Sequence, residues 1–126
     1  MDEEPLLTLL EQWESVYKKG LLTFWLLLLL YGRSMYVFEM GQALADLSRG
    51  TISADEKSLY RALRRFEATG LVKSTWRPSE VGPRRRYYDL TDLGMALLRR
   101  FTQRNLLVFQ DPRVAPVLAR LLEGGD

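Results

Sequence analysis

The chain has 126 residues, which is enough for one domain with a single core. Hydrophobic residues make up 47% of it, which excludes a disordered polypeptide. It contains no cysteine and no histidine, which excludes disulfides, thiolate nucleophiles and thiolate zinc sites and removes the commonest general base. The net charge of +2 is unevenly spread: positions 57–86 hold nine lysines and arginines against two glutamates, and positions 1–16 hold five acids without a base, which predicts a phosphate-binding basic face and an acidic end.

The N-terminal segment is predicted to form an amphipathic helix. Acidic residues followed by proline, from Asp2 to Pro5, favour a helix start, and an apolar stripe follows between Leu6 and Tyr17. So short a chain offers no obvious core for this stripe. We therefore expect the helix to pack on a partner subunit; an ordinary amphipathic helix on its own domain is the alternative.

Two further helices are predicted before position 50. Residues 21–31, LLTFWLLLLLY, are apolar almost all round, which indicates burial on every side. The run is too short for a membrane span, which needs ~20 apolar residues, and we expect no membrane partner. A helix shared by the core and a dimer interface explains its apolarity. Residues 35–48 are predicted to form the next helix, with Phe38, Ala45 and either Leu44 or Leu47 inward.

Residues 53–70 predict a third helix whose outer face is basic. Ser53 and Glu56 fit a capping box at its start, and Gly70 fits a left-handed residue at its end. The predicted buried face, spaced i, i+3, i+4 and i+7, comprises Leu59, Ala62, Leu63 and Phe66.

A two-stranded ribbon is predicted next. Residues 71–76 and 86–90 have strand character, and the loop 77–85 between them is basic and contains proline and glycine. A helix followed by a ribbon with a basic tip is a winged-helix pattern. The helix suits a DNA major groove, and the ribbon suits a flanking groove or phosphates.

The C-terminal part is predicted to be helical. Thr91 can cap a helix over residues 92–109, and Asp111-Pro112 can start a shorter one that glycines end. The apolar surface of the longer helix is broader than a surface helix needs, so we expect part of it to meet a second subunit. The predicted fold is mainly α with a two-stranded β-wing. Its parts are an N-terminal dimerisation arm (1–19), a winged helix-turn-helix domain (20–91) and C-terminal dimerisation helices (92–126).

The segments SLYRALRRFEATGLV and GPRRRYYDLTDLG, with a tryptophan between them, resemble the signature of PadR-type transcriptional regulators. With GLLTFWLLLLLYG and MYVFEM, the resemblance covers residues 19–101. It implies a homodimeric repressor that binds double-stranded DNA and is released by a small aromatic or hydrophobic effector. The sequence departs from the family at Lys57, usually small or glycine, and at Arg61, usually proline. It also departs at Val37-Phe38, usually Gly-Tyr, so the hydroxyl that the family's tyrosine brings near DNA is missing.

Ten residues of the third helix and the ribbon are candidates for DNA binding. They are Lys57, Ser58, Tyr60, Arg61, Arg64, Arg65, Arg77, Arg84, Arg85 and Arg86. Three of the helix cations are spaced i, i+4 and i+7 on one face, and the resemblance supports Ser58, Tyr60 and Arg64. For any one cation we favour a phosphate contact, because most protein–DNA hydrogen bonds go to phosphate or sugar. A solvated helix face and a loop that only aids solubility are the alternatives.

Three aromatic residues are candidates for an effector site between subunits: Trp13, Trp25 and Phe109. Related repressors bind flat aromatic effectors in this way, and flat rings stack on tryptophan. For Trp25 the alternative is simple packing in the core.

Other functions are less consistent with the sequence. A winged-helix module that mediates protein contacts without specific DNA binding is the main alternative, because Lys57 and Arg61 leave the family pattern. An enzyme is not expected, since neither histidine nor cysteine is present and no paired carboxylates are recognisable from spacing. We expect no cofactor and no metal. The acidic N-terminus does not resemble a signal peptide, and we expect a cytoplasmic protein.

Overall fold

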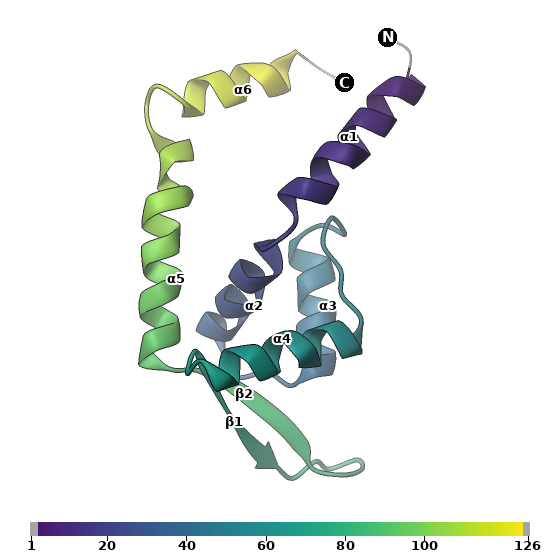
Figure 1. Ribbon diagram of the computed structural model, residues 1–126, viewed down its shortest axis with the longest axis vertical. Helices are drawn as coiled ribbons and strands as arrows, with labels where there is room; N and C mark the ends of the chain where they lie inside the picture. Colours follow the sequence, from purple (N-terminus) through teal and green to yellow (C-terminus); the bar gives the residue numbers. More distant parts are fainter. Residues whose placement is uncertain (1–2, 125–126) are drawn as a thin grey trace.

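The computed structural model describes residues 3–124, and within them the chain forms six α-helices, one 3-10 helix and two strands (Figure 1). In chain order the elements are α1 (Glu3–Tyr17), α2 (Leu21–Gly32), α3 (Val37–Leu47), α4 (Glu56–Ala68), β1 (Val72–Arg77), β2 (Arg85–Leu90), α5 (Asp92–Asn105), η1 (Leu107–Gln110) and α6 (Ala115–Glu123). The predicted mainly α fold with a two-stranded wing is confirmed. Asp2 and Gly125, assigned above to helix ends, lie outside the described residues.

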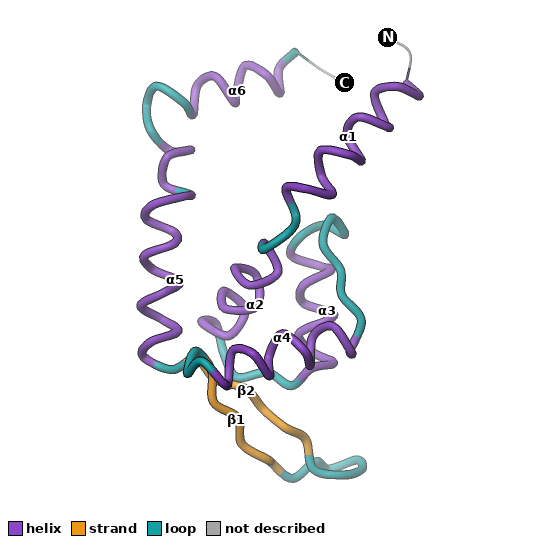
Figure 2. The backbone as a smooth tube through the Cα atoms, viewed as in Figure 1, coloured by secondary structure: helices purple, strands orange, loops and turns teal. Residues whose placement is uncertain are grey.

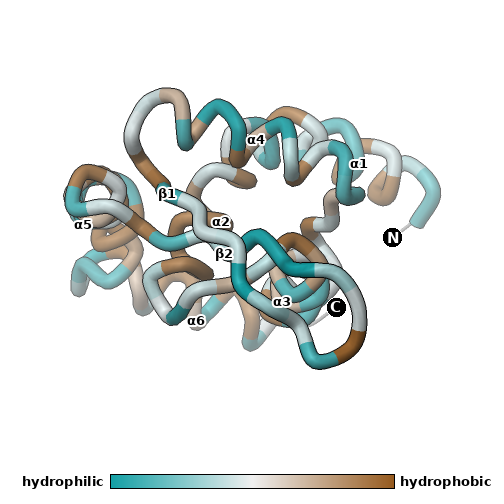
Figure 3. Tube along the Cα trace, turned by 90° about the horizontal axis from the view of Figure 1, so that it is seen from below, coloured by the Kyte–Doolittle hydropathy of each residue, from teal (hydrophilic) through white to brown (hydrophobic). Residues whose placement is uncertain are grey.

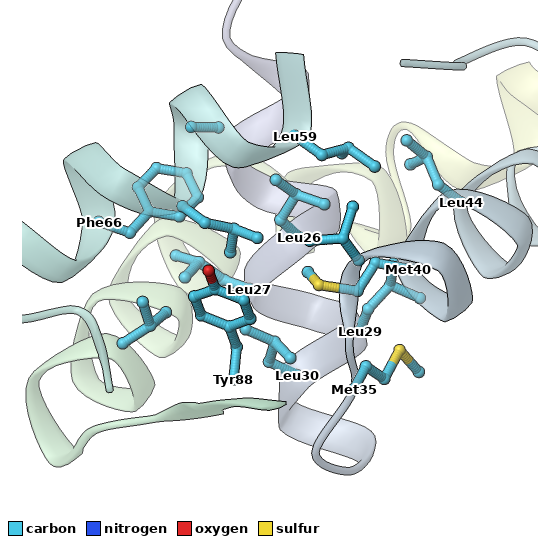
Figure 4. Close-up of a cluster of buried hydrophobic side chains, with 14 of the residues drawn as sticks. Leu26, Leu27, Leu29, Leu30, Met35, Met40, Leu44, Leu59, Phe66 and Tyr88 are labelled. Carbon is cyan, nitrogen blue, oxygen red and sulfur yellow. The ribbon is translucent and has the colours of Figure 1, made fainter. Parts of the chain in front are cut away.

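The core forms around α2. Its buried leucines are Leu26, Leu27, Leu29 and Leu30, and α3, α5 and β2 pack around the helix. In Figure 4 these leucines point toward Met40 of α3, Phe66 of α4 and Tyr88 of β2. Each fully buried leucine contributes about 1.5–3 kcal/mol, so α2 supplies a large share of the stability.

None of the helices within residues 3–124 is long and apolar enough to cross a membrane.

The turn between α3 and α4 fixes how these two helices meet. The Ser48 hydroxyl accepts a hydrogen bond from the Ile52 N–H (3.1 Å) and donates one to the Ile52 carbonyl (3.0 Å). Ser48 is buried, so both bonds are shielded from water. Gly50 has a φ of 76°, a left-handed conformation that reverses the chain at low steric cost. The turn thereby presents α4 next to α3 as a helix-turn-helix pair.

The start of α4 differs from the prediction. Asp55, not Ser53, is the capping residue, and its carboxylate accepts the Ser58 N–H at 2.8 Å. A carboxylate also interacts favourably with the positive end of the helix dipole, which a serine hydroxyl does not. The four predicted buried residues are all confirmed, and Gly70 ends the helix in a left-handed conformation (φ 82°).

The inward face of α3 also differs in part. Phe38 is 54% exposed, so its prediction as an inward residue is wrong. Of the two leucines predicted as alternatives, Leu44 is fully buried and Leu47 is exposed, and Ala45 is half-buried. The helix begins at Val37, and the face that meets the core is formed by Val37, Met40 and Leu44, spaced i, i+3 and i+7. The Phe38 ring instead stacks on the Tyr36 ring, with centroids 6.5 Å apart.

The wing is an antiparallel ribbon, drawn in orange in Figure 2. Its register pairs Val72 with Leu90 at the base and Arg77 with Arg85 at the tip, one residue longer at each tip end than predicted. Met35 forms a bridge with Tyr88, and the two residues exchange backbone hydrogen bonds of 3.3 and 2.9 Å. The segment before α3 therefore lies along the outer edge of β2.

Helix α5 is shorter than the predicted helix over residues 92–109. Thr91 caps α5 by accepting the Gly94 N–H, as expected, but the helix ends at Asn105 and a 3-10 turn follows. The Asn105 amide donates to the Phe101 carbonyl, a local side-chain bond that competes with regular helix. The last helix starts at Ala115, because Asp111 first bonds the Arg113 N–H in a turn.

Apolar surface remains exposed on the helices that extend from the core. No residue of α1 or α6 is buried, and brown and teal segments alternate along α1 in Figure 3. Within the described residues, the exposed apolar side chains of these arms include Leu9, Trp13, Val16, Leu97, Phe101, Val108, Phe109, Leu121 and Leu122. By contrast, α2 buries most of its apolar side chains in the core. This helix was predicted to be shared with a dimer interface, and the large apolar side chains that it exposes are Leu28 and Tyr31.

Gly94 provides a test of the junction between the wing and α5. A methyl group there would press on the Leu71 carbonyl oxygen and lie 3.0 Å from Leu90 Cδ2. The Leu71 carbonyl also accepts the Thr91 N–H (3.1 Å), so it cannot retreat freely. We expect Gly94→Ala to reduce the free energy of unfolding by about 1–3 kcal/mol in urea titrations at fixed protein concentration. Gly32→Ala, with open space around it, should change it by about 1 kcal/mol or less; equal losses in both variants would contradict the tight junction.

Candidate nucleic-acid interface

The outward face of α4 carries four exposed cations: Lys57, Arg61, Arg64 and Arg65. None of them forms an ion pair with another residue in the described range 3–124. Their charges are therefore available to an external partner. Lys57 and Arg61 lie close enough to the Asp55 carboxylate to interact with it electrostatically, but four cations on one helix still leave a net positive face, which attracts a polyanion.

Ser58 and Tyr60 have different surroundings from these cations. Ser58 is half-buried, and its N–H is occupied by Asp55. The backbone and side-chain hydrogen bonds from Ser58 hold the pKa of the Asp55 carboxyl below its usual value, which keeps this helix cap charged. Tyr60 is exposed on the side of α4 that faces the wing.

A three-residue clasp joins the end of α4 to the wing. Glu67 Oε1 lies 2.9 Å from Arg86 Nη2, and Glu67 Oε2 accepts the Ser74 hydroxyl at 2.8 Å. The clasp closes because Arg86 Nε donates to Ser74 Oγ at 2.9 Å. Arg86 is thus satisfied inside the protein, and its guanidinium also lies 5.5 Å from the centre of the buried Tyr88 ring. The structure therefore gives Arg86 a role in holding the wing.

A second clasp fastens the other face of the wing. Arg77 Nη2 lies 3.7 Å from Asp89 Oδ2 and donates to Ser34 Oγ at 3.3 Å, and the Ser34 hydroxyl bonds Asp89. The Arg77 guanidinium also lies over the Tyr87 ring, 4.5 Å from its centre. Arg77, like Arg86, is therefore engaged in the protein's own contacts.

Arg84 and Arg85 remain at the tip of the wing. Arg84 lies in the loop and has no hydrogen bond or ion pair among the described residues, and Arg85 opens β2 with its guanidinium 4.5 Å from the centre of the Tyr36 ring. A stack on an aromatic ring leaves the charge of Arg85 uncompensated. These two arginines, together with the cations of α4, form the free positive charge of this side of the molecule.

The structure also reveals residues that sequence reasoning missed. Trp76 and Tyr36 line a hollow of about 360 Å³ between α4 and the wing, together with Tyr60 and the three tip arginines. A signal for Trp76 existed in the sequence: it alternates with Ser74 and Val72 on the strand face that meets α4. Tyr36 carried no such signal, because its place depends on how the segment before α3 runs along β2.

The three candidate effector residues lie on three separate elements. Trp13, 73% exposed, borders a shallow hollow formed by α1 alone, and Trp25 packs beside Phe24 against the core with ring centroids 6.1 Å apart. Phe109 is exposed on η1. No group of three or more histidine, cysteine, aspartate or glutamate residues within positions 3–124 is placed to hold a metal ion.

The clasp between Glu67 and Arg86 makes a testable distinction among the wing arginines. We expect Arg86→Ala to lower the free energy of unfolding by about 1 kcal/mol, since both partners are partly exposed and solvent weakens the pair. Amide hydrogen exchange in β1 and β2 should also become faster. Arg84→Ala is the matched control and should change the stability by less than about 0.5 kcal/mol. Equal effects of the two changes on unfolding and exchange would show that the clasp does not hold the wing.

Comparisons with known proteins identify relatives of this chain. The model of the transcriptional regulator PadR-like family matches residues 26–100. No curated protein matches the sequence. A PadR-like transcriptional regulator from Bacillus cereus strain ATCC 14579 is 29% identical with a TM-score of 0.63, over 86% of this chain and 97% of that one.

Two more distant structures share the fold. A PadR family transcriptional regulator from Eggerthella lenta DSM 2243 is 24% identical, with a TM-score of 0.69 over 94% of this chain and 96% of that one. Bacillus subtilis PadR in complex with operator DNA is 18% identical, with a TM-score of 0.60 over 64% of this chain and 46% of that one. Since the matched residues 26–100 make up more than half of the sequence and include α4 and the wing, this chain belongs to the PadR-like family of transcriptional regulators.

Proposed function

We propose that the protein is a sequence-specific repressor that binds double-stranded DNA as a homodimer in the cytoplasm. The observation that carries the proposal is the free positive charge of α4, where four cations point outward without an ion pair among residues 3–124. Family membership supports it, and so does the similar fold of Bacillus subtilis PadR, a protein solved with operator DNA. The proposal involves binding alone and assigns no catalytic step.

The arrangement of α4 and the wing supports a specific docking mode. An α-helix fits the major groove, and a ribbon beside it reaches the neighbouring groove or backbone. Arg61 and Arg64, one turn apart on α4, are proposed to face the floor of the major groove. Arg84 and Arg85 at the wing tip are proposed to contact phosphates, and Arg77 and Arg86 to hold the wing in place.

The exposed apolar arms support a homodimer. Soluble monomers rarely expose large apolar patches, and a twofold dimer would cover those of α1, α5 and α6 with a self-complementary surface. Charge complementarity points the same way. In the described residues α1 carries Glu3, Glu4, Glu11 and Glu14, whereas α5 and α6 carry Arg99, Arg100, Arg104 and Arg120. We therefore propose that α1 of one subunit packs on α5 and α6 of the other, so that 1–19 and 92–126 serve as dimerisation segments.

A small flat aromatic or hydrophobic effector is the second part of the proposal. Trp13 and Phe109 lie on the arms that the dimer would bring together, and Trp25 lies at the edge of the core on α2, the helix that follows α1. An effector that binds between subunits would change their relative orientation and release DNA. The competing function is a winged-helix module that contacts proteins; it would leave the cations of α4 without a role.

Selection of bound sequences from random duplexes tests the main proposal. A recovered pseudo-palindrome, with half-sites about one turn or ~34 Å apart, is expected for a dimer. If Arg61 or Arg64 reads a guanine, its alanine variant should lose ~1–3 kcal/mol at one base position and relax the preference there. A uniform loss across all sequences would make that residue a phosphate contact. Binding that is equal for every duplex, or absent at low salt, would refute sequence-specific recognition.

Dimerisation makes its own prediction. If the arms form the interface, folding and association are linked, and the melting temperature should rise with protein concentration. Leu122→Glu places a charge on a side chain that is 84% exposed in one chain, so it should give monomers in sedimentation without disturbing the core. Val81→Glu, at a wing residue that is 81% exposed, is the matched control and should stay dimeric. A well-folded wild-type monomer at micromolar concentration would refute the dimer.

A further inference from the structure

The hollow between α4 and the wing has an unusual lining. It is bounded by one residue of α4, one of β1, the wing tip and the residue before α3. These residues are Tyr36, Tyr60, Trp76, Arg84, Arg85 and Arg86. All six are aromatic or cationic, and none is acidic. At about 360 Å³ the hollow has room for roughly twelve waters at ~30 Å³ each, or for a larger group that displaces them.

The charges around the hollow are not equivalent. Arg86 is neutralised by Glu67 at 2.9 Å, so it contributes little net charge. Arg84 has no partner within the described chain, and Arg85 is held over the Tyr36 ring without losing its charge. Two positive charges are therefore presented here without a counterion. The Tyr36 and Tyr60 hydroxyls donate no hydrogen bond to the described residues, so both can donate to a ligand.

The position of the hollow determines what would enter it on DNA. If α4 lies in the major groove and the wing reaches the minor groove beside it, the strand between those grooves passes between α4 and the wing. That strand presents its phosphates and sugars outward, and its base edges face the grooves. The hollow therefore faces a phosphate rather than a base. Cations and hydroxyls are the groups that bind phosphate oxygens.

We infer that this hollow is the seat of one phosphodiester group of the bound strand, an inference that rests on the proposed DNA-binding function. Arg84 and Arg85 supply its positive charge, and the hydroxyls of Tyr36 and Tyr60 donate hydrogen bonds to its oxygens. The Trp76 ring packs against the adjoining sugar. The stack of Arg85 on Tyr36 at 4.5 Å orders both side chains before DNA arrives, which lowers the entropy lost on binding. Tyr36 thus becomes a DNA contact from outside α4 and the wing.

Single neutral linkages in the DNA provide the test. The duplex recovered by selection is prepared as a series, each member with one methylphosphonate in place of a phosphodiester. Wild-type protein should lose about tenfold in affinity when the seated phosphate is neutralised, as expected for loss of a charged hydrogen-bonding group. Tyr36→Phe keeps the ring on which Arg85 stacks and removes only the hydroxyl. It should bind the unmodified duplex several-fold more weakly and lose less than wild type when that one phosphate is neutralised, because one of its hydrogen bonds is already gone, while the other linkages still cost it as much as wild type.

Two further variants complete the design. Tyr60→Phe, at an exposed residue whose hydroxyl forms no hydrogen bond in the described chain, should show the same coupling to the same linkage. Tyr31→Phe removes a hydroxyl from α2, outside the hollow, and should keep the wild-type profile. Independent, additive losses at every linkage in both Tyr36→Phe and Tyr60→Phe would overturn the phosphate seat while leaving specific DNA binding intact. A protein that binds no duplex at all would instead overturn the proposed function and the seat with it.

Discussion

Burial of α2 is the constraint on which the rest of the fold depends. A helix that is apolar on nearly every side must be surrounded, and the chain has few elements with which to surround it. α3 and α5 pack against it, and β2 contributes the buried Tyr88 ring. Because each of these elements is used to cover α2, their relative positions are fixed together. The outward face of α4 does not pack in the core, and it carries the cations.

The two clasps show how a basic surface can also be a stable one. The cations of α4 and the wing, among them Arg77 and Arg86, would repel one another if all were free, and these two are paired with acidic side chains of the protein. Glu67 holds Arg86, and Asp89 holds Arg77, so each wing face is fastened by one arginine. The remaining arginines, Arg84 and Arg85, stay uncompensated. Because the arginines that fasten the wing to the protein are not the ones left without an acidic partner, the wing can be rigid and still attract a polyanion.

The sequence predicted the parts of the structure that depend on local patterns. The buried face of α4, the ribbon and the Thr91 cap all follow from spacing and residue type, and they are confirmed. The cap of α4 was misplaced by two residues, because serine and aspartate in one short segment both fit the pattern and only the charge of Asp55 separates them. Phe38 was wrongly predicted to face inward. The helix was predicted from residue 35 but begins at Val37, and its inward face is formed by Val37, Met40 and Leu44, which leaves Phe38 exposed.

The candidate site was harder to predict, because its contacts join residues distant in the chain. Three adjacent arginines in the sequence looked equivalent, yet Arg86 bonds Glu67, nineteen residues earlier, while Arg84 remains free. Nothing in the local sequence separates them. Tyr36 approaches Arg85 only because the Met35–Tyr88 bridge lays the segment before α3 along β2. Long-range pairing of this kind leaves no periodic signal.

The passage from the wing to α5 has a mechanical consequence. β2 ends at Leu90 and α5 begins at Asp92, so Thr91 alone separates them, and its hydroxyl bonds the Gly70 carbonyl at 2.5 Å. Such a junction leaves no slack between the part that would touch DNA and the arm that would join two subunits. In the proposed dimer, the distance and orientation between the two DNA-binding domains would be fixed. One added base pair turns a half-site by about 35° around the double helix, so the dimer would reject operators whose half-sites have the wrong spacing as well as those with the wrong bases.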